Sequence, residues 1–207
     1  MCAGGSTTTT YTVTSVSDAK SCPRAGTGSA LVTVKTRPAA VVSGGGAFCP
    51  GSSVTITATL TGTAPWTVKW SDNVTQTINS GTTATRSVNP ASTTTYTVTS
   101  LSDAAACPTV GTGSAIVTRN VAASIATQPS NKTTTRNTNV TLSVVAAGTA
   151  PISYQWFLGN GTSISGATSS SYTTSFPNKG TNTFYVEVWN ACNTTHVRSN
   201  TVTVTVN

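Results

Sequence analysis

The sequence predicts an all-β chain made of β-sandwich modules in tandem, and three observations support this. Charge is scarce, with 11 Lys and Arg and 4 Asp and Glu in 207 residues, while β-branched Thr and Val, which favour pleated strands, are abundant. Apolar residues alternate with Thr along short segments, the period of a strand with one buried face. Long segments recur about 85 residues apart, a spacing that fits whole domains rather than solenoid repeats.

The internal repeat has two parts. Residues 11–33 (YTVTSVSDAKSCPRAGTGSALVT) match residues 96–118 (YTVTSLSDAAACPTVGTGSAIVT), which begin 85 positions later. Residues 62–70 (GTAPWTVKW) match residues 148–156 (GTAPISYQW) at an offset of 86. Two different segments therefore repeat with nearly the same period.

This period divides the chain into three parts. We expect an incomplete module over residues 1–37, a complete sandwich over 38–121 and a second complete sandwich over 122–207. Turn sequences such as GTAP, SDN, NSG and GTG separate the expected strands. Many short strands in about 85 residues favour two packed sheets.

In the middle part, alternation predicts which side chains are buried. The expected strands are VTITATL (54–60), WTVKW (66–70), TYTVTS (95–100) and SAIVT (114–118). Trp70 lies on the same face as the other apolar residues of its strand, and Tyr96 faces inward with its neighbour Val98. We therefore assign Trp70 and Tyr96 to the core.

The last part repeats the scheme with other residues. Its expected strands are VTLSVV (140–145), ISYQW (152–156), FYVEVWN (184–190) and TVTVTV (201–206). Alternation places Phe184 in the core and leaves Tyr185 and Trp189 on the outer face. These two aromatics are candidate interface residues, and the alternative is that a neighbouring loop or module covers them.

These residues carry a resemblance. The patterns TGTAPWTVKWSDNVTQT, NPASTTTYTVTSLSDA and GTGSAIVT resemble the immunoglobulin-like modules repeated in large bacterial secreted and cell-surface proteins, and QPSNKTTTRNTNVTLSVVAAGTAPISYQWF resembles a sister group. The resemblance implies tandem immunoglobulin-like β-sandwich domains. It places Trp70 and Trp156 at the core tryptophan of the third strand. It also implies an extracellular or cell-surface location, and the export signal that this requires is not in the chain.

Residues 1–37 match only the last two or three strands of such a module. A partial sandwich exposes an apolar face and unpaired strand edges, which promote association. Two explanations stay open: the first module is truncated, or another chain supplies the missing strands. The second would join subunits head to tail and produce filaments.

Five cysteines without zinc-ligand spacing indicate disulfides in an oxidising compartment. Because the resemblance brings the two strand ends together at one pole, we expect Cys49 and Cys107 to pair. Cys22 is expected to pair with the missing equivalent of Cys49 or with Cys2. Cys192 is expected to be a free buried thiol or a crosslink to another chain. Cys2, Cys22 and Cys192 are thus candidate crosslinks between modules or chains.

The composition argues against several functions. Four acids and one histidine, His196, offer little for acid–base catalysis, so we expect no enzyme, no catalytic residue, no metal and no cofactor. The basic residues are scattered, which argues against nucleic acid as a partner. No apolar run is long enough to span a membrane.

The expected function is structural. We predict a subunit or repeat segment of an extracellular bacterial filament, sheath or surface stalk, joined by β-strand contacts between modules or chains. Its expected partners are further copies of the chain or flanking modules of the same protein. The alternative is a cell-surface adhesin or a module that binds glycan or protein, because rows of Thr and Ser hydroxyls can bond to carbohydrate.

Overall fold

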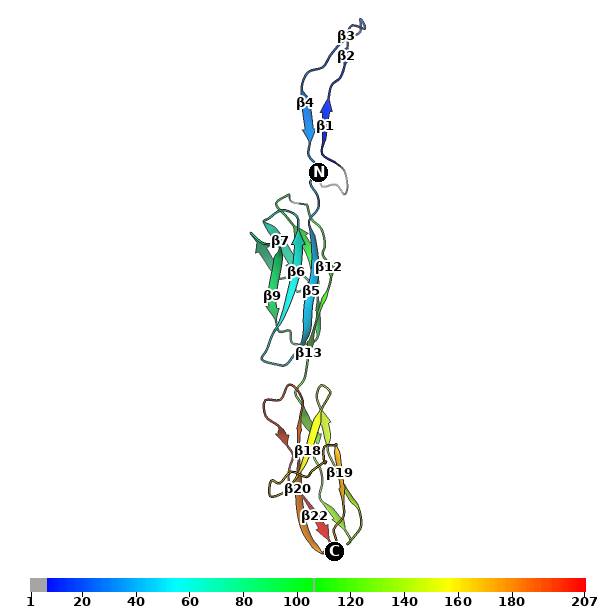
Figure 1. The fold of residues 1–207 in the computed structure, drawn as a ribbon, viewed down its shortest axis with the longest axis vertical. Helices are drawn as coiled ribbons and strands as arrows, with labels where there is room; N and C mark the ends of the chain where they lie inside the picture. Colours follow the sequence, from blue (N-terminus) through cyan, green and yellow to red (C-terminus); the bar gives the residue numbers. More distant parts are fainter. Residues whose placement is uncertain (1–6, 106) are drawn as a thin grey trace. The chain divides into compact units, whose positions relative to one another are not determined.

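The computed structural model describes residues 7–105 and 107–207, and every regular element in these ranges is a β-strand (Figure 1). No helix in the described part is long and apolar enough to cross a membrane. The chain forms two compact units. The first comprises Met1–Gly46, Thr55–Val88 and Thr94–Val117, and the second comprises Ala47–Val54, Asn89–Thr93 and Thr118–Asn207.

The first unit begins with a two-stranded ribbon over residues 8–34, which we call the strand ribbon. Strand β1 (Thr9–Thr12) pairs with β4 (Ser29–Val32) in antiparallel register, and a shorter ladder joins β2 (Val16–Ser17) to β3 (Pro23–Arg24). All twelve residues of these four strands are exposed. A two-stranded ribbon without a packed face is marginal in water.

The rest of the first unit is a β-sandwich. One sheet has the order β10-β13-β5-β6-β9, with β12 pairing β5, and the other has the order β11-β7-β8. The strands are β5 (Ala39–Phe48), β6 (Val54–Thr61), β7 (Trp66–Trp70), β8 (Thr75–Ile78), β9 (Thr83–Val88), β10 (Thr94–Tyr96), β11 (Val98–Ser102), β12 (Thr112–Gly113) and β13 (Ala115–Arg119).

The core of this sandwich follows the predicted alternation. In β7, Trp66, Val68 and Trp70 are buried while the residues between them are exposed. Trp70 packs fully inside and its Nε1 donates to Oε1 of Gln76 at 2.8 Å, so the indole N–H is satisfied. Tyr96 is buried as well.

The segment expected as one strand over residues 95–100 is two strands in the structure. Strand β10 pairs with β13 in one sheet, and β11 pairs with β7 in the other. The chain therefore crosses from one sheet to the other at Thr97, whose backbone N–H bonds to Oγ of Ser71. Alternation alone does not reveal such a crossing because the inward positions continue through it.

The second unit contains the C-terminal sandwich. Its main sheet has the order β15-β22-β20-β18, with β21 pairing β20, and the pairs β14–β17 and β16–β19 complete it. The strands are β14 (Ser124–Thr127), β15 (Lys132–Thr134), β16 (Val140–Ser143), β17 (Val145–Ala147), β18 (Ser153–Leu158), β19 (Ser171–Thr174), β20 (Gly180–Trp189), β21 (Val197–Arg198) and β22 (Val202–Val206).

Phe184 lies in the core of this sandwich, as alternation predicts, and so does Trp156, as the resemblance predicts. Trp156 is fully buried, and its Nε1 donates to the carbonyl of Ser169 at 3.0 Å. Along β22, Val202, Val204 and Val206 are buried. The valines face one way and the threonines the other, which is the pattern of a strand with one packed face.

The predicted disulfide between Cys49 and Cys107 is wrong, because Cys49 is bonded to Cys192. Cys49 lies in the turn between β5 and β6, whereas Cys107 follows β11, whose end pairs with the start of β7. Ala104 near Cys107 bonds to Thr63, at the end of the sandwich opposite the β5–β6 turn. Cys107 is also disulfide-bonded. The prediction for Cys2 lies outside the described residues.

Candidate interaction site

The strand ribbon reproduces a strand pair of the complete sandwich, residue by residue. In the ribbon Tyr11 pairs with Ala30, and 85 positions later Tyr96 pairs with Ala115 in the same antiparallel register. The shorter ladder agrees too, because the Val16–Arg24 pair corresponds to the bridge between Leu101 and Thr109. The ribbon therefore has the local structure of the last strands of a module.

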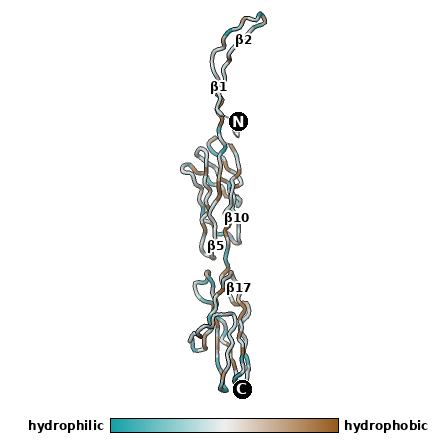
Figure 2. Tube along the Cα trace, turned by 45° about the vertical axis from the view of Figure 1, so that its right-hand side comes forward, coloured by the Kyte–Doolittle hydropathy of each residue, from teal (hydrophilic) through white to brown (hydrophobic). Residues whose placement is uncertain are grey.

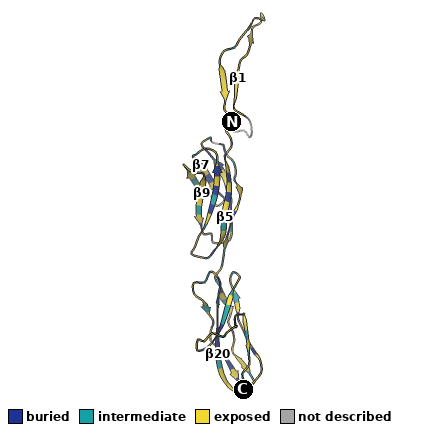
Figure 3. Cartoon of the chain, in the orientation of Figure 1, coloured by how far each residue is buried: buried dark blue, intermediate teal, exposed yellow. Residues whose placement is uncertain are grey.

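The two copies differ in what covers them. Tyr11 is 61% exposed and its counterpart Tyr96 is 5% exposed; Val32 is 50% exposed and Val117 is fully buried. Val13 and Val16 are exposed as well, while their counterparts Val98 and Leu101 are buried. Figure 3 shows the ribbon in the colour of exposed residues, and Figure 2 shows apolar residues along it. The ribbon thus presents, uncovered, a face that the complete sandwich buries.

Two glycines extend the likeness to the free edge of the ribbon. Gly113 has a φ of +72°, and a Cβ there would lie 2.6 Å from the carbonyl oxygen of Val42 in β5. Gly28, its counterpart, has a φ of +91° and has open space around the same position. Glycine tolerates this left-handed backbone. Gly28 therefore has the same left-handed backbone as Gly113, where β5 approaches β12 closely, but no strand lies beside Gly28.

A shallow concavity lies on the ribbon. It has a volume of about 400 Å³ and is lined by Tyr11, Thr12, Val13, Thr27, Gly28, Ser29 and Ala30. Cys22, the counterpart of Cys107, is exposed and is a free thiol. Of the three candidate crosslink cysteines, Cys22 is thus unpaired and Cys192 is bonded within the chain.

The Cys49–Cys192 bridge joins the β5–β6 turn to the loop after β20, two segments that both belong to the second compact unit. The two cysteines are separated by 143 residues in sequence. Beside the bridge, the N–H of Asn120 donates to the carbonyl of Phe48 at 2.8 Å. The covalent link connects residues that the repeat assigns to different modules. Cys192 is therefore bonded within the chain, so it is neither a free thiol nor a crosslink to another chain.

Asparagine side chains fix the same loop. Asn190 is buried, and its Nδ2 donates to the carbonyl oxygens of Val121 and Thr149, both at 2.8 Å. Asn193 accepts the N–H of Ala123 at 2.8 Å and donates back to that residue's carbonyl. Sequence reasoning missed this network. The available signal was that Asn190 occupies the place of Asp103 in the preceding module.

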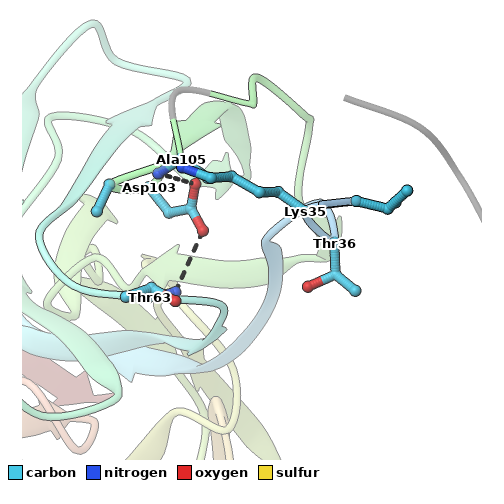
Figure 4. A pocket seen from close by; sticks show the side chains of 7 residues that line it. Lys35, Thr36, Thr63, Asp103 and Ala105 are labelled. Carbon is cyan, nitrogen blue, oxygen red and sulfur yellow. Dashed lines mark hydrogen bonds between the residues drawn. The ribbon is translucent and has the colours of Figure 1, made fainter. Parts of the chain in front are cut away.

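Asp103 shows the matching arrangement in the first unit (Figure 4). Its carboxylate accepts the N–H of Ala105 at 2.9 Å and that of Thr63 at 3.2 Å. It borders a pocket of about 280 Å³ that residues Val34, Lys35, Thr36, Ala104 and Ala105 also line. Asp18 bonds to Lys20 in the same way within the ribbon. Both aspartates therefore shape turns through backbone N–H groups.

The two outer-face aromatics are covered by neighbouring side chains. Tyr185 is buried, because Phe157 stacks on its ring at 4.9 Å and Arg198 lies over it at 3.6 Å. Trp189 is half-buried and stacks on His196 at 3.9 Å, while His196 contacts Glu187 at 3.0 Å. Of the two alternatives for Tyr185, the structure agrees with coverage by neighbouring residues and not with a free aromatic surface. Alternation indicated the direction of its side chain but not the arginine that covers it.

An ion pair lies on the outer part of the first sandwich. The Arg86 guanidinium donates two bonds to the Asp72 carboxylate, at 2.9 and 2.7 Å. These bonds, above all, hold the pKa of Asp72 below its usual value of 3.8, against the opposing effect of burial. Arg86 also lies over the rings of Trp70 and Tyr96. Burial raises the pKa of Tyr96 above its usual value.

Among residues 7–105 and 107–207, no group of three or more His, Cys, Asp or Glu side chains is placed to hold a metal ion. The candidate site consists of strand edges and an exposed apolar face. Surfaces of this kind bind extended protein segments through main-chain hydrogen bonds and side-chain pockets.

Comparison with known proteins places the fold. An I-band fragment from titin aligns with 82% of the chain, with a TM-score of 0.57 and 19% sequence identity. The eight N-terminal Ig domains of Down Syndrome Cell Adhesion Molecule align with 89% of the chain, with a TM-score of 0.52 and 12% sequence identity. The sandwiches have an immunoglobulin-like fold. The chain spans 65% of the length of the titin fragment and 27% of the adhesion-molecule fragment. No family model matches the chain, and comparison with curated proteins finds no match.

Proposed function

We propose that this chain is a structural segment of an extracellular bacterial filament, sheath or surface stalk, in which immunoglobulin-like modules are joined by strand contacts and disulfides. The observation that carries the proposal is the strand ribbon, which has the register of β10 and β13 and leaves the corresponding apolar face exposed. Such a face joins one module to strands from elsewhere. Contacts of this type are heterologous, and repeated head to tail they do not close.

The covalent link between modules supports the same proposal. Cys49 and Cys192 join two segments that the repeat places in successive modules. A disulfide resists separation in an oxidising environment, which is the environment of secreted and surface proteins. An extended array that must bear load outside the cell gains from such a link.

The composition agrees with a structural role. The outward positions of many strands are Thr or Ser, as in β6 and β22. Rows of hydroxyls stabilise exposed sheets across strands without charge. Asp103 and Asp18 accept backbone N–H groups in turns, so these two carboxylates serve the fold. We assign the chain no catalytic residue and no cofactor.

Negative-stain electron microscopy of the protein from its native source tests the proposal. We expect filaments or sheath fragments with an axial repeat that matches two to three modules. Mass spectrometry of the purified assemblies then identifies the chain as their constituent. Isolated short rods would contradict the proposal and direct attention to the adhesin alternative.

A further inference from the structure

The uncovered face of the strand ribbon defines the partner that fits it. In the complete sandwich, the same strands pack against β5 to β9, which we call the half-sandwich (residues 38–92). Strand β5 lies beside β13, and β7 pairs with β11. We propose that the ribbon is a docking surface for a second half-sandwich of this kind, distinct from residues 38–92. This inference rests on the proposed function and names the partner of the joint.

The face of the ribbon selects such a partner by its side chains. In the complete sandwich Val98 and Leu101 of β11 pair with Trp70 and Val68 of β7 in the same sheet, and these four side chains and Trp66 are buried. Val13 and Val16, the counterparts of the last two, are exposed on the ribbon. A partner must therefore present a strand of alternating large apolar residues like that of β7. Burying this face removes apolar surface from water on both sides.

The backbone at the edge of the ribbon also restricts which partner can bind. Thr112 and Gly113 of β12 pair in parallel with Val41 and Val42 of β5. The close approach at Gly113 leaves no room for a Cβ. Gly28 keeps this feature on the ribbon, where nothing lies within 4 Å. A β5-like strand would supply the main-chain hydrogen bonds that strand addition uses.

The ribbon is also an incomplete structure by itself. Its strands have no buried residue, and Tyr11, Val13, Val16, Leu31 and Val32 are at least half exposed. Two strands without a packed face do not reach independent stability. Docking of a half-sandwich would bury the exposed apolar faces of both partners, because a half-sandwich without its last strands exposes the complementary face.

Two adjacent residues on β4 provide a matched pair of variants. Val32 corresponds to Val117, which is fully buried, whereas Leu31 corresponds to Ile116, which is 55% exposed. Both Val32 and Leu31 are exposed on the ribbon, so neither substitution removes a contact from the free chain. Val32→Asp would bury a charge in the joint, and Leu31→Asp would leave its charge in solvent.

The test titrates the isotope-labelled chain with a fragment of residues 38–92, refolded by dilution in its presence and followed by NMR. We expect a one-to-one complex with amide shifts confined to residues 9–32. Val32→Asp should weaken it roughly tenfold or more, and Leu31→Asp should leave it unchanged. A synthetic peptide of residues 93–119 serves as the positive control, because it restores the natural sandwich.

A fusion makes the test independent of the fragment's solubility. Placing residues 38–92 directly before Thr8 recreates the natural junction, since Thr8 corresponds to Thr93. We expect the fused ribbon to gain amide protection and Tyr11 to become buried. Failure of the fusion to protect the ribbon would overturn the inference. Self-association of the free chain with the same sensitivity to Val32→Asp would also overturn it. Filaments from the native source would leave the proposed function standing in each case.

Discussion

Tyr11 and Tyr96 occupy the same place in two copies of one strand pair, yet Tyr11 is exposed and Tyr96 is buried. Both pair with an alanine in the same register, Ala30 and Ala115 respectively. The difference therefore comes from what packs against the pair and not from the pair itself. Tyr96 lies in a core that β5 to β9 complete. The exposed copy is the basis of the proposed joint.

The core tryptophan of the C-terminal sandwich is expected to dominate its stability. Trp156→Ala should lower the free energy of unfolding by about 3–5 kcal/mol, because it leaves a cavity and an unpaired carbonyl at Ser169. Leu158→Ala, on the same strand but partly exposed, should cost roughly 1 kcal/mol or less. Urea denaturation followed by circular dichroism measures both. Equal losses for the two variants would contradict the assignment of Trp156 to the core.

The disulfide between Cys49 and Cys192 is expected to stabilise the second unit. Cys192→Ser should lower the free energy of unfolding by roughly 2–5 kcal/mol, because the bridge restricts the unfolded chain. Cys22→Ser should have little effect, since Cys22 is exposed and free. Thermal unfolding of the two variants measures this. Non-reducing peptide mapping that finds Cys49 linked to any other cysteine would refute the bridge.

The buried side chain at position 190 must donate hydrogen bonds. Asn190→Asp would replace the Nδ2 donor by an oxygen that faces the carbonyls of Val121 and Thr149, and the variant should unfold more easily by about 1–3 kcal/mol. Asp103→Asn makes the converse change, because it turns an acceptor of the Thr63 N–H into a donor. Chemical denaturation of both variants tests this. If either exchange is neutral, the donor and acceptor roles assigned to that side chain are wrong.

The ion pair between Asp72 and Arg86 is expected to make stability depend on pH. The pKa of Asp72 is lowered in the folded protein, chiefly by the Arg86 side chain. The stabilisation is therefore fully present above the unfolded pKa of about 3.9 and is lost as the pH falls through the folded value.

Asp72→Asn tests this sign. At pH 6 the variant should be less stable by about 1 kcal/mol, because the pair is partly exposed and screened by solvent. The difference should shrink as the pH is lowered towards 2. Asp18→Asn, whose carboxylate bonds locally to Lys20, is the control. Urea titrations at several pH values measure the difference, and one that grows on acidification would contradict the expected sign.

Alternation predicted the core and the general positions of the strands, although it missed the crossing between sheets at Thr97. Trp70, Tyr96 and Phe184 were placed inside from the period and Trp156 from the resemblance, and the structure buries all four. The internal repeat also predicted that residues 1–37 match only the last strands of a module. These features depend on local pattern, which a single sequence carries in full.

The disulfide and the aromatic surface were not predictable in the same way. Cys49 and Cys107 were paired on the assumption that two strand ends share a pole, but β11 ends beside the start of β7, away from the β5–β6 turn. Alternation left open whether Tyr185 is free or covered, and Arg198 from the neighbouring strand covers it. Both outcomes depend on which segments distant in sequence come together, and alternation does not contain that information.

Hydrogen exchange at the strand ribbon in native assemblies tests the central claim most directly. The backbone amides of residues 9–17 and 29–32 would be followed by mass spectrometry in the isolated chain and in assemblies from the native source. We predict rapid exchange in the isolated chain and strong protection in the assemblies, comparable to that of residues 94–102. Equally rapid exchange in both samples would show that nothing covers the ribbon in the assembly and would contradict the proposed joint.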